Sequence, residues 1–267
     1  MIVRTRLGVV GCDIAGDGVP LVWLHGYPLD RTLWAPQLAA ALPVVRQVAP
    51  DLPGFGGSAR LPERSFDAWA DWVAALLDAL AIERCILGGL SMGGYLAFAC
   101  WRRHPSRIRA LVLADTRAGQ DSAEARARRE ENQRLLETQG VGALAERLLP
   151  GMVGRTTRRE RPEVPAALDA MMRRADPAAV GDAREALIGR DDSAPSLPTI
   201  TVPTLVLCGD EDALTPLAES RALADAIPGA RLAVVPQAGH CSNLEQPAVF
   251  NALLSEFLVA TIRTHPT

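Results

Sequence analysis

An alternation of short apolar runs with longer amphipathic segments constrains the fold of this 267-residue chain most strongly. The apolar runs are rich in branched residues and are predicted to be strands over residues 21–24, 44–49, 84–88, 108–115, 204–208 and 232–235, after an antiparallel pair within 2–14. Helices are predicted over residues 32–42, 66–80, 92–104 and 246–262. This order indicates an α/β fold with a mostly parallel sheet and crossover helices.

Residues 117–198 interrupt the alternation. They contain arginine-rich helical segments and no strand candidate, and prolines separate these segments. We therefore predict a core domain of residues 1–116 and 199–267 with an inserted helical lid of residues 117–198. The alternative is a helical decoration that only covers the sheet edge. The lid is favoured because the insertion leaves the carboxyl end of a strand, where open α/β sheets bind their ligands.

Composition and charge exclude several classes of protein. All 28 basic residues are arginines. The net charge of -3 nevertheless argues against the basic surface that a nucleic-acid-binding protein needs. No apolar run approaches the roughly 20 residues that span a bilayer, and the N-terminus lacks the apolar core of a signal peptide. Five cysteines without close spacing indicate free thiols in a reducing, cytoplasmic setting and no cysteine metal site.

The strongest candidate for chemistry is Ser91, in the segment Gly88-Gly89-Leu90-Ser91-Met92-Gly93-Gly94. A predicted strand ends just before this serine and a predicted helix starts just after it. The sharp turn between them exposes the hydroxyl and brings backbone close on both sides, which requires glycine at 89 and 93. A GxSxG string alone is weak, because glycine-rich chains produce it by chance. The strand-turn-helix context makes Ser91 a candidate nucleophile.

Two backbone N–H groups are candidates for stabilising negative charge on a reacting carbonyl oxygen. One is that of Met92, at the start of the helix behind Ser91. The other is that of Tyr27, in His25-Gly26-Tyr27-Pro28 after the strand 21–24, because Pro28 has no N–H to donate. His25 itself is predicted to brace this loop by hydrogen bonding.

Three acidic residues follow the strand 204–208 in Gly209-Asp210-Glu211-Asp212. An acid that orients a histidine must be held firmly and shielded from water. Asp212 is favoured because apolar residues follow it, whereas Asp210 and Glu211 are expected to be solvated or to cap the turn. Asp115, at the end of another strand, is the main competitor and is expected to be a turn or cap residue at the start of the lid.

His240 is the histidine with a setting suited to catalysis. It follows Gly239 on the loop after the last predicted strand, where a flexible loop can bring an imidazole to Ser91. His104 lies at a helix end and is predicted to be a cap. His265 lies in the C-terminal tail.

These motifs together resemble the α/β-hydrolase superfamily over essentially the whole chain. The resemblance rests on the HG loop, the turn Asp51-Leu52-Pro53-Gly54-Phe55-Gly56, the elbow around Ser91, the GDEDALTP turn and the closing GH loop. It implies an eight-stranded, mostly parallel twisted sheet with helices on both faces. A serine at the elbow disfavours the dehalogenase and epoxide-hydrolase branches, which use aspartate. The elbow and length are similar to small bacterial carboxylesterases and to 3-oxoadipate enol-lactonases.

The resemblance also implies a mechanism. Ser91, His240 and Asp212 would form a catalytic triad that hydrolyses a small-molecule ester through an acyl-enzyme, with Tyr27 and Met92 as oxyanion donors and without a metal or organic cofactor. A lactonase, a hydrolase of carbon-carbon bonds and a non-catalytic binding protein of the same fold are the alternatives. The oligomeric state, monomer or homodimer, is not determined by the sequence.

The lid offers two hypotheses about the substrate. Its apolar stripe either lines an acyl pocket or packs the lid onto the core, and the second is the more common role; the stripe comprises Leu135, Leu136, Leu144, Leu148, Leu149, Met152, Met171 and Met172. Arginines such as Arg155, Arg158, Arg159 and Arg161 either pair with a carboxylate on the substrate or are simply solvated.

Overall fold

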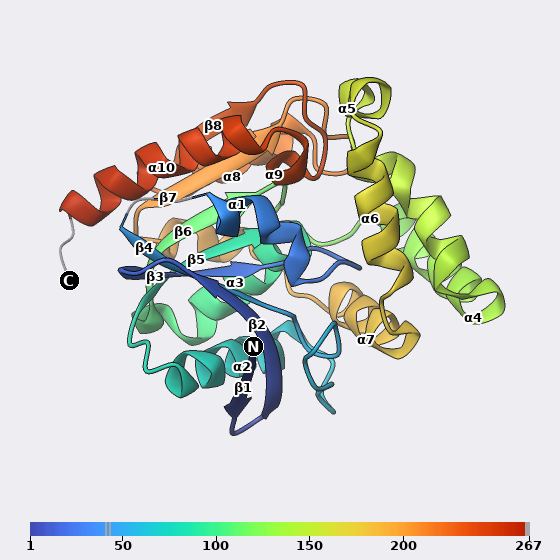
Figure 1. Cartoon of the computed structure of the whole chain (residues 1–267), viewed down its shortest axis with the longest axis horizontal. Coiled ribbons are helices and arrows are strands. Elements are labelled where there is room, and N and C mark those ends of the chain that lie inside the picture. Colours follow the sequence, from blue (N-terminus) through green and yellow to red (C-terminus); the bar gives the residue numbers. More distant parts are fainter. Residues whose placement is uncertain (41, 43, 265–267) are drawn as a thin grey trace.

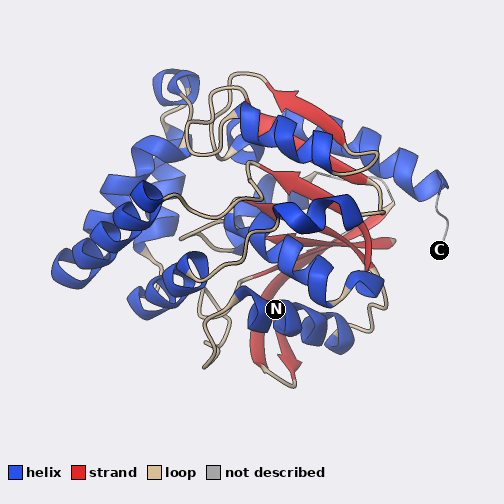
Figure 2. Ribbon diagram, turned by 180° about the vertical axis from the view of Figure 1, so that it is seen from behind, coloured by secondary structure: helices blue, strands red, loops and turns tan. Residues whose placement is uncertain are grey.

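The computed structural model describes residues 1–40, 42 and 44–264, and its central feature is an eight-stranded sheet with helices on both faces (Figures 1 and 2). The strands are β1 (Ile2–Thr5), β2 (Gly8–Ala15), β3 (Val19–Leu24), β4 (Val45–Pro50), β5 (Cys85–Leu90), β6 (Ile108–Ala114), β7 (Thr204–Gly209) and β8 (Arg231–Val235). Their order across the sheet is β1-β2-β4-β3-β5-β6-β7-β8. Only the β1–β2 and β2–β4 pairs are antiparallel among the described strands, so the predicted mostly parallel sheet is confirmed.

The strands form because both faces of the sheet are covered, so that alternate side chains enter two different cores. In β3, Val22 and Leu24 belong to one hydrophobic cluster, and Leu21 and Trp23 belong to the other. This accounts for the continuous apolar character of residues 21–24 in the sequence.

Helices on each face complete the two cores. The helices of the sheet domain are α1 (Ala35–Ala39), α2 (Phe66–Ala79), α3 (Met92–Arg103), α8 (Leu217–Ala226), α9 (Ser242–Glu245) and α10 (Pro247–Thr264). Side chains of α2, α3 and α8 pack in the first cluster, and those of α10 pack in the second. The helix predicted over 32–42 is shorter than expected, since a 3₁₀ turn (Arg31–Trp34) precedes α1; residue 41 of that prediction lies outside the described residues.

The segment 117–198 lies between β6 and β7 and forms α4 (Ala123–Met152), α5 (Arg155–Glu160), α6 (Glu163–Arg173), α7 (Pro177–Ile188) and a 3₁₀ turn (Ala194–Thr199). All its residues are described, and none of them is in a strand. The four helices stand together at one side of the sheet (Figure 1). Within α4, Gly140 has a φ of 82° and marks a kink.

Ion pairs and hydrogen bonds fasten these helices to the core at separate points. Arg60, after β4, binds Asp182 of α7 at 2.6 Å, and Arg174, at the end of α6, binds Asp30 at 2.6 Å. The helices α6 and α7 of the segment 117–198 are thus each held to the core by an ion pair.

Candidate active site

Ser91 lies on the turn between β5 and α3, with φ 54° and ψ −111°. A positive φ is costly for a residue with a side chain and is found where the surrounding structure enforces it. The flanking glycines are part of that enforcement. A Cβ on Gly89 would lie 2.2 Å from the Gly93 carbonyl oxygen, and a Cβ on Gly93 would lie 2.1 Å from that of Leu24. The steric reason predicted for both glycines is therefore confirmed.

His240 and Asp212 are hydrogen-bonded, with 2.9 Å between the imidazole Nδ1 and the carboxylate Oδ2. Both side chains are buried. The same carboxylate accepts hydrogen bonds from the backbone N–H groups of Leu214 and Thr215 and from the Thr215 hydroxyl at 2.6 Å. Asp212 is thus fixed by its own turn, as the prediction for this acid required.

The electrostatics of the pair follow from this contact. Burial alone would lower the pKa of His240, but the Asp212 carboxylate and its hydrogen bond outweigh burial and raise that pKa above its usual value. Burial acts to raise the pKa of Asp212, and the imidazole, with the Thr215 donors, reverses this so that the pKa is lowered. Asp212 is therefore ionised at neutral pH.

One cavity of about 330 Å³ brings the other predicted residues together. Ser91, Met92, Tyr27 and His240 all line it. Asp212 does not line it and contacts the imidazole through Nδ1. Met92 is the first residue of α3, so its backbone N–H has no acceptor within the helix and is free to bind a ligand atom.

His25 has the predicted bracing role. Its Nε2 accepts a hydrogen bond from the Leu52 N–H at 2.9 Å, and its Nδ1 lies 3.0 Å from the Gly26 carbonyl oxygen. Burial lowers the pKa of His25, which keeps the ring neutral and able to accept. The loop that carries Tyr27 is thereby tied to the turn after β4. His104 occupies the predicted C-cap position of α3 through its backbone N–H, but its imidazole lies 2.7 Å from an Asp71 carboxylate oxygen of α2; His265 lies outside the described residues.

Of the rejected acids, Asp210 is exposed as expected, but Glu211 differs from its prediction. The Glu211 carboxylate accepts hydrogen bonds from the backbone N–H of Thr156 at 2.8 Å and from the Thr156 hydroxyl at 2.6 Å. It therefore binds α5 to the turn that holds Asp212. No local sequence signal indicates this contact, because its partner lies 55 residues away.

Asp115 lies in the bend directly after β6, as expected of a turn residue, with a φ of 46°. Its full burial was not predicted. Its carboxylate accepts hydrogen bonds from the Gly209 N–H at 2.9 Å and from the Ser242 hydroxyl at 2.5 Å. Asp115 thus joins the ends of β6 and β7 to the residues that follow His240, and it holds the loops of the acid and the histidine in place.

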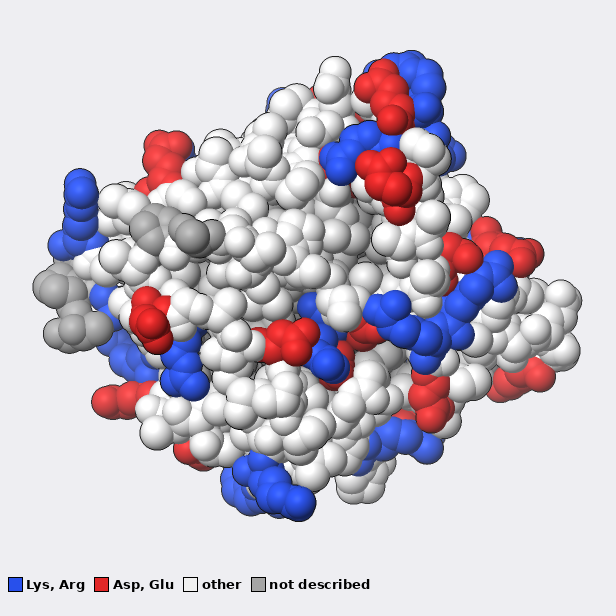
Figure 3. All heavy atoms as spheres, in the orientation of Figure 1, with Lys and Arg blue, Asp and Glu red and all other residues white. Residues whose placement is uncertain are grey.

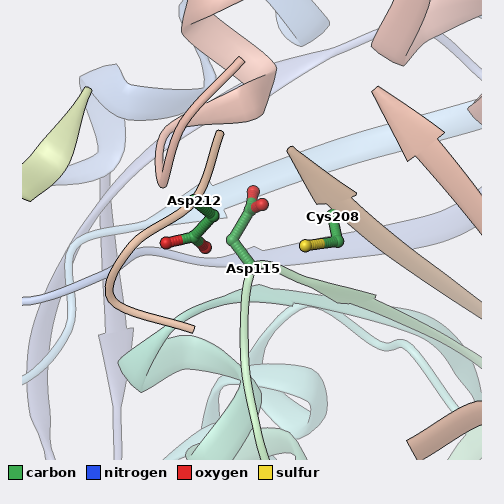
Figure 4. Close-up of side chains that lie close together, drawn as sticks. All are labelled: Asp115, Cys208 and Asp212. Carbon is green, nitrogen blue, oxygen red and sulfur yellow. The ribbon is translucent and has the colours of Figure 1, made fainter. Parts of the chain in front are cut away.

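Asp115, Cys208 and Asp212 lie close together, with their potential ligand atoms within 4.8 Å of one another (Figure 4). They do not fit a metal site. Both carboxylates already accept hydrogen bonds from the protein. Burial raises the pKa of the Cys208 thiol to about 12, so it stays protonated and is a poor ligand. The cluster therefore serves as structural support for the site.

Replacing Asp115 with asparagine is expected to change kcat/KM by less than about threefold. Burial, followed by the nearby Asp212 carboxylate, raises the pKa of Asp115 well above its usual value, so this position disfavours a negative charge and is expected to tolerate an uncharged amide. The amide still accepts from Gly209 and places its NH₂ group against the Ser242 oxygen. Asp115→Ala leaves the buried Gly209 N–H unpaired, which costs about 1–3 kcal/mol of folding free energy. Thermal unfolding and ester turnover test both variants; an equal loss in the two would contradict the prediction.

The residues of the segment 117–198 divide between the alternatives that the sequence left open. Of the predicted apolar stripe, Leu148 and Met152 line the cavity, whereas others, such as Leu144 and Met172, are fully buried in the hydrophobic clusters. Among the described residues, the arginines predicted as carboxylate partners do not line it; Arg155, for example, pairs with Glu211 at 3.1 Å. Acidic and basic side chains are interspersed over the lid (Figure 3).

Comparisons with known proteins agree with this geometry. Residues 19–247 match the family model described as the alpha/beta hydrolase fold, and the chain belongs to this family. It is 34% identical to the 2-hydroxymuconate semialdehyde hydrolase of Pseudomonas sp. (strain CF600), over 91% of this chain and 88% of that protein. The five motifs that carry the resemblance in the sequence had predicted this family.

Solved structures show the same relationship. A thermophilic esterase from Thermogutta terrifontis, solved with malate bound, superposes with a TM-score of 0.93 at 36% identity and covers 98% of both chains. The enol-lactonase from Burkholderia xenovorans LB400 has a TM-score of 0.89 at 30% identity, over 97% of this chain and all of that one. The predicted resemblance to esterases and enol-lactonases is confirmed. In the described part of the chain, every helix is too short or too polar to cross a bilayer.

Proposed function

We propose that this protein is a serine hydrolase that cleaves a small carboxylic ester through Ser91, His240 and Asp212. The observation that carries the proposal is the 2.9 Å contact between His240 and a buried Asp212, with His240 and Ser91 on the wall of one cavity. A hydroxyl at an exposed elbow, an imidazole and an orienting carboxylate are the parts that acyl transfer requires.

The proposed reaction has two steps. The Ser91 oxygen attacks the ester carbonyl and His240 takes its proton, since Asp212 occupies Nδ1 and leaves Nε2 for this exchange. The backbone N–H groups of Met92 and Tyr27 hold the oxyanion, and removing such a donor costs about 3–4 kcal/mol of transition-state stabilisation. His240 returns the proton to the leaving alcohol. It then deprotonates a water that cleaves the acyl-enzyme, which releases the acid and regenerates the Ser91 hydroxyl.

Two related activities remain as candidates because similar proteins carry those names. The B. xenovorans protein is an enol-lactonase, and the Pseudomonas protein is a 2-hydroxymuconate semialdehyde hydrolase. A lactone is an internal ester, so the same residues suffice for its hydrolysis. We place the ester first because the T. terrifontis structure with the TM-score of 0.93 is an esterase. The five free cysteines fit the reducing cytoplasm, which we propose as the location.

A substrate panel with the purified protein tests the proposal. We expect kcat/KM for short p-nitrophenyl esters to exceed that for lactones and for the products of aromatic ring cleavage by tenfold or more. A preference for the ring-cleavage products would replace the esterase by a carbon-carbon bond hydrolase. No turnover of any of the three would support a non-catalytic binding protein.

The pH dependence of kcat/KM should show an acid limb with a midpoint above 6.5, the ordinary pKa of histidine. His240 must be neutral to accept the proton, and its pKa is raised by Asp212, so activity is lost as the pH falls through this raised value. In Asp212→Asn the midpoint should move to lower pH, because the carboxylate that favours the imidazolium is gone. A wild-type midpoint below 6.5 would contradict the assignment of His240 as the base.

A further inference from the structure

The cavity that contains Ser91 has four arginines on its wall. Arg117 comes from the loop after β6, and Arg128, Arg129 and Arg147 come from α4. Among the described residues, Asp121 is the one acidic side chain that lines the same cavity. Such an excess of positive charge is unnecessary for binding a neutral ester and favours a negatively charged ligand.

The ion pairs of Asp121 show how much of the positive charge of these arginines is not neutralised. Its carboxylate binds Arg129 at 2.5 Å, Arg117 at 2.6 Å and Arg190 at 2.9 Å. Burial acts to raise the pKa of Asp121, but the hydrogen bonds and charges of these arginines lower it to about 2. Three arginines therefore face Asp121, and Glu219 also acts on Arg117, so that these five side chains keep a net charge of +1. Arg147, by contrast, is paired with Glu131 at 2.8 Å.

Thr116, the residue before Arg117, holds the loop of Arg117 beside the nucleophile. The Thr116 hydroxyl donates a hydrogen bond to the Ser91 carbonyl oxygen at 2.8 Å, so the loop that carries Arg117 lies against the elbow. The Nε of Arg117 is buried and has no hydrogen-bond partner in the described structure. A buried N–H without an acceptor is costly, and an acceptor on a ligand would remove that cost.

Arg128 lies on the lid side of the cavity. Its side chain is exposed, and the charge interaction found for it is with Glu124, one turn earlier on α4. Arg117 and Arg128 thus approach the cavity from two different elements, the loop after β6 and the helix α4. A guanidinium offers a planar pair of donors that matches a carboxylate, and it keeps its charge at any working pH.

We infer that the substrate carries a free carboxylate in addition to its ester group. Arg117 and Arg128 bind this carboxylate while the ester carbonyl lies at Ser91. The substrate class is then the half-esters of dicarboxylic acids. This inference rests on the proposed esterase function and deepens it. The arginines expected from the sequence for this role, in the segment 155–161, are replaced by others that line the cavity.

Two esters of equal acyl length test the inference: mono-p-nitrophenyl glutarate, which keeps a free carboxylate, and p-nitrophenyl valerate, which is neutral. We expect wild-type kcat/KM to be at least tenfold higher for the glutarate ester. Arg128→Gln should lower this preference about tenfold and change valerate turnover by less than threefold, and Arg117→Gln should lower the preference by a similar factor. Arg126→Gln is the matched control, because Arg126 is an exposed residue of the same helix that does not line the cavity.

A binding measurement separates this inference from the proposed function. Calorimetry on Ser91→Ala should show that monomethyl glutarate, which has one free carboxylate, binds at least tenfold more tightly than the uncharged methyl valerate, and that Arg128→Gln removes the difference. Equal turnover of the two esters by a wild type that reacts at Ser91 would overturn the carboxylate site alone. A protein that turns over neither ester but binds monomethyl glutarate through Arg128 would overturn the esterase and leave the carboxylate site standing. Equal binding of monomethyl glutarate and methyl valerate overturns the inference.

Discussion

Ser91→Ala is expected to lower ester turnover about 10⁶-fold, to the limit of detection. The acyl-enzyme needs an oxygen nucleophile at the elbow, and alanine offers none at the one position where β5, α3 and the cavity meet. Folding should be unaffected, because the substitution removes one oxygen atom and keeps the Cβ. The thermal unfolding midpoint measured beside kcat checks this.

Ser106→Ala is the matched control for this variant, since Ser106 is an exposed serine before β6. It should keep full activity. His240→Ala is expected to match Ser91→Ala in its loss, because the serine and its base act as one unit and their losses do not add in the double variant. More than about 1% of wild-type activity in a stable Ser91→Ala protein would place the nucleophile elsewhere.

Asp212→Asn is expected to lower kcat about 10⁴-fold, as the loss of the orienting carboxylate does in other triads. Asp212 holds the proton of His240 on Nδ1 at 2.9 Å and is itself held by three donors from residues 214 and 215. The uncharged amide of asparagine can donate its NH₂ to an unprotonated Nδ1. The ring proton then lies on Nε2, which no longer accepts the serine proton.

Steady-state kinetics on Asp212→Asn, with Asp210→Asn as the control, measures this effect. Asp210 is exposed and belongs to the same turn, so its variant should retain wild-type kcat. A loss at Asp210 as large as that at Asp212 would show that the turn as a whole matters and not its orienting carboxylate. An unchanged kcat in Asp212→Asn, with Asp115→Asn inactive, would transfer the role to Asp115.

The sequence was sufficient for the sheet because the strands have local signatures. Residues 21–24 are apolar on both faces, and each face is covered by helices whose own patterns are equally local. The elbow was predicted for the same reason: the strand, the serine and the helix are adjacent, and Gly89 and Gly93 are close enough in sequence to be recognised together.

The environments of Asp115 and Glu211 were not predicted, because their partners are remote in sequence. Asp115 accepts from Ser242, 127 residues away, and Glu211 from Thr156. The arginines of the cavity were missed for a similar reason. Arginine is frequent throughout the lid, and only the packing of α4 against the core distinguishes Arg128 from Arg126. The roles of Ser91, His240 and Asp212 in catalysis remain predictions that the experiments above address.

The most direct test of the account is to treat the native protein with a fluorophosphonate and map the adduct by mass spectrometry. The reagent bonds to a serine oxygen only where a base activates it and donors stabilise the charged phosphorus oxygen. We predict one adduct, on Ser91, formed quickly by the wild type, slowly by Asp212→Asn and not at all by His240→Ala. An adduct on another serine, or equal labelling of Ser91 in His240→Ala, would contradict the proposal that His240 activates Ser91.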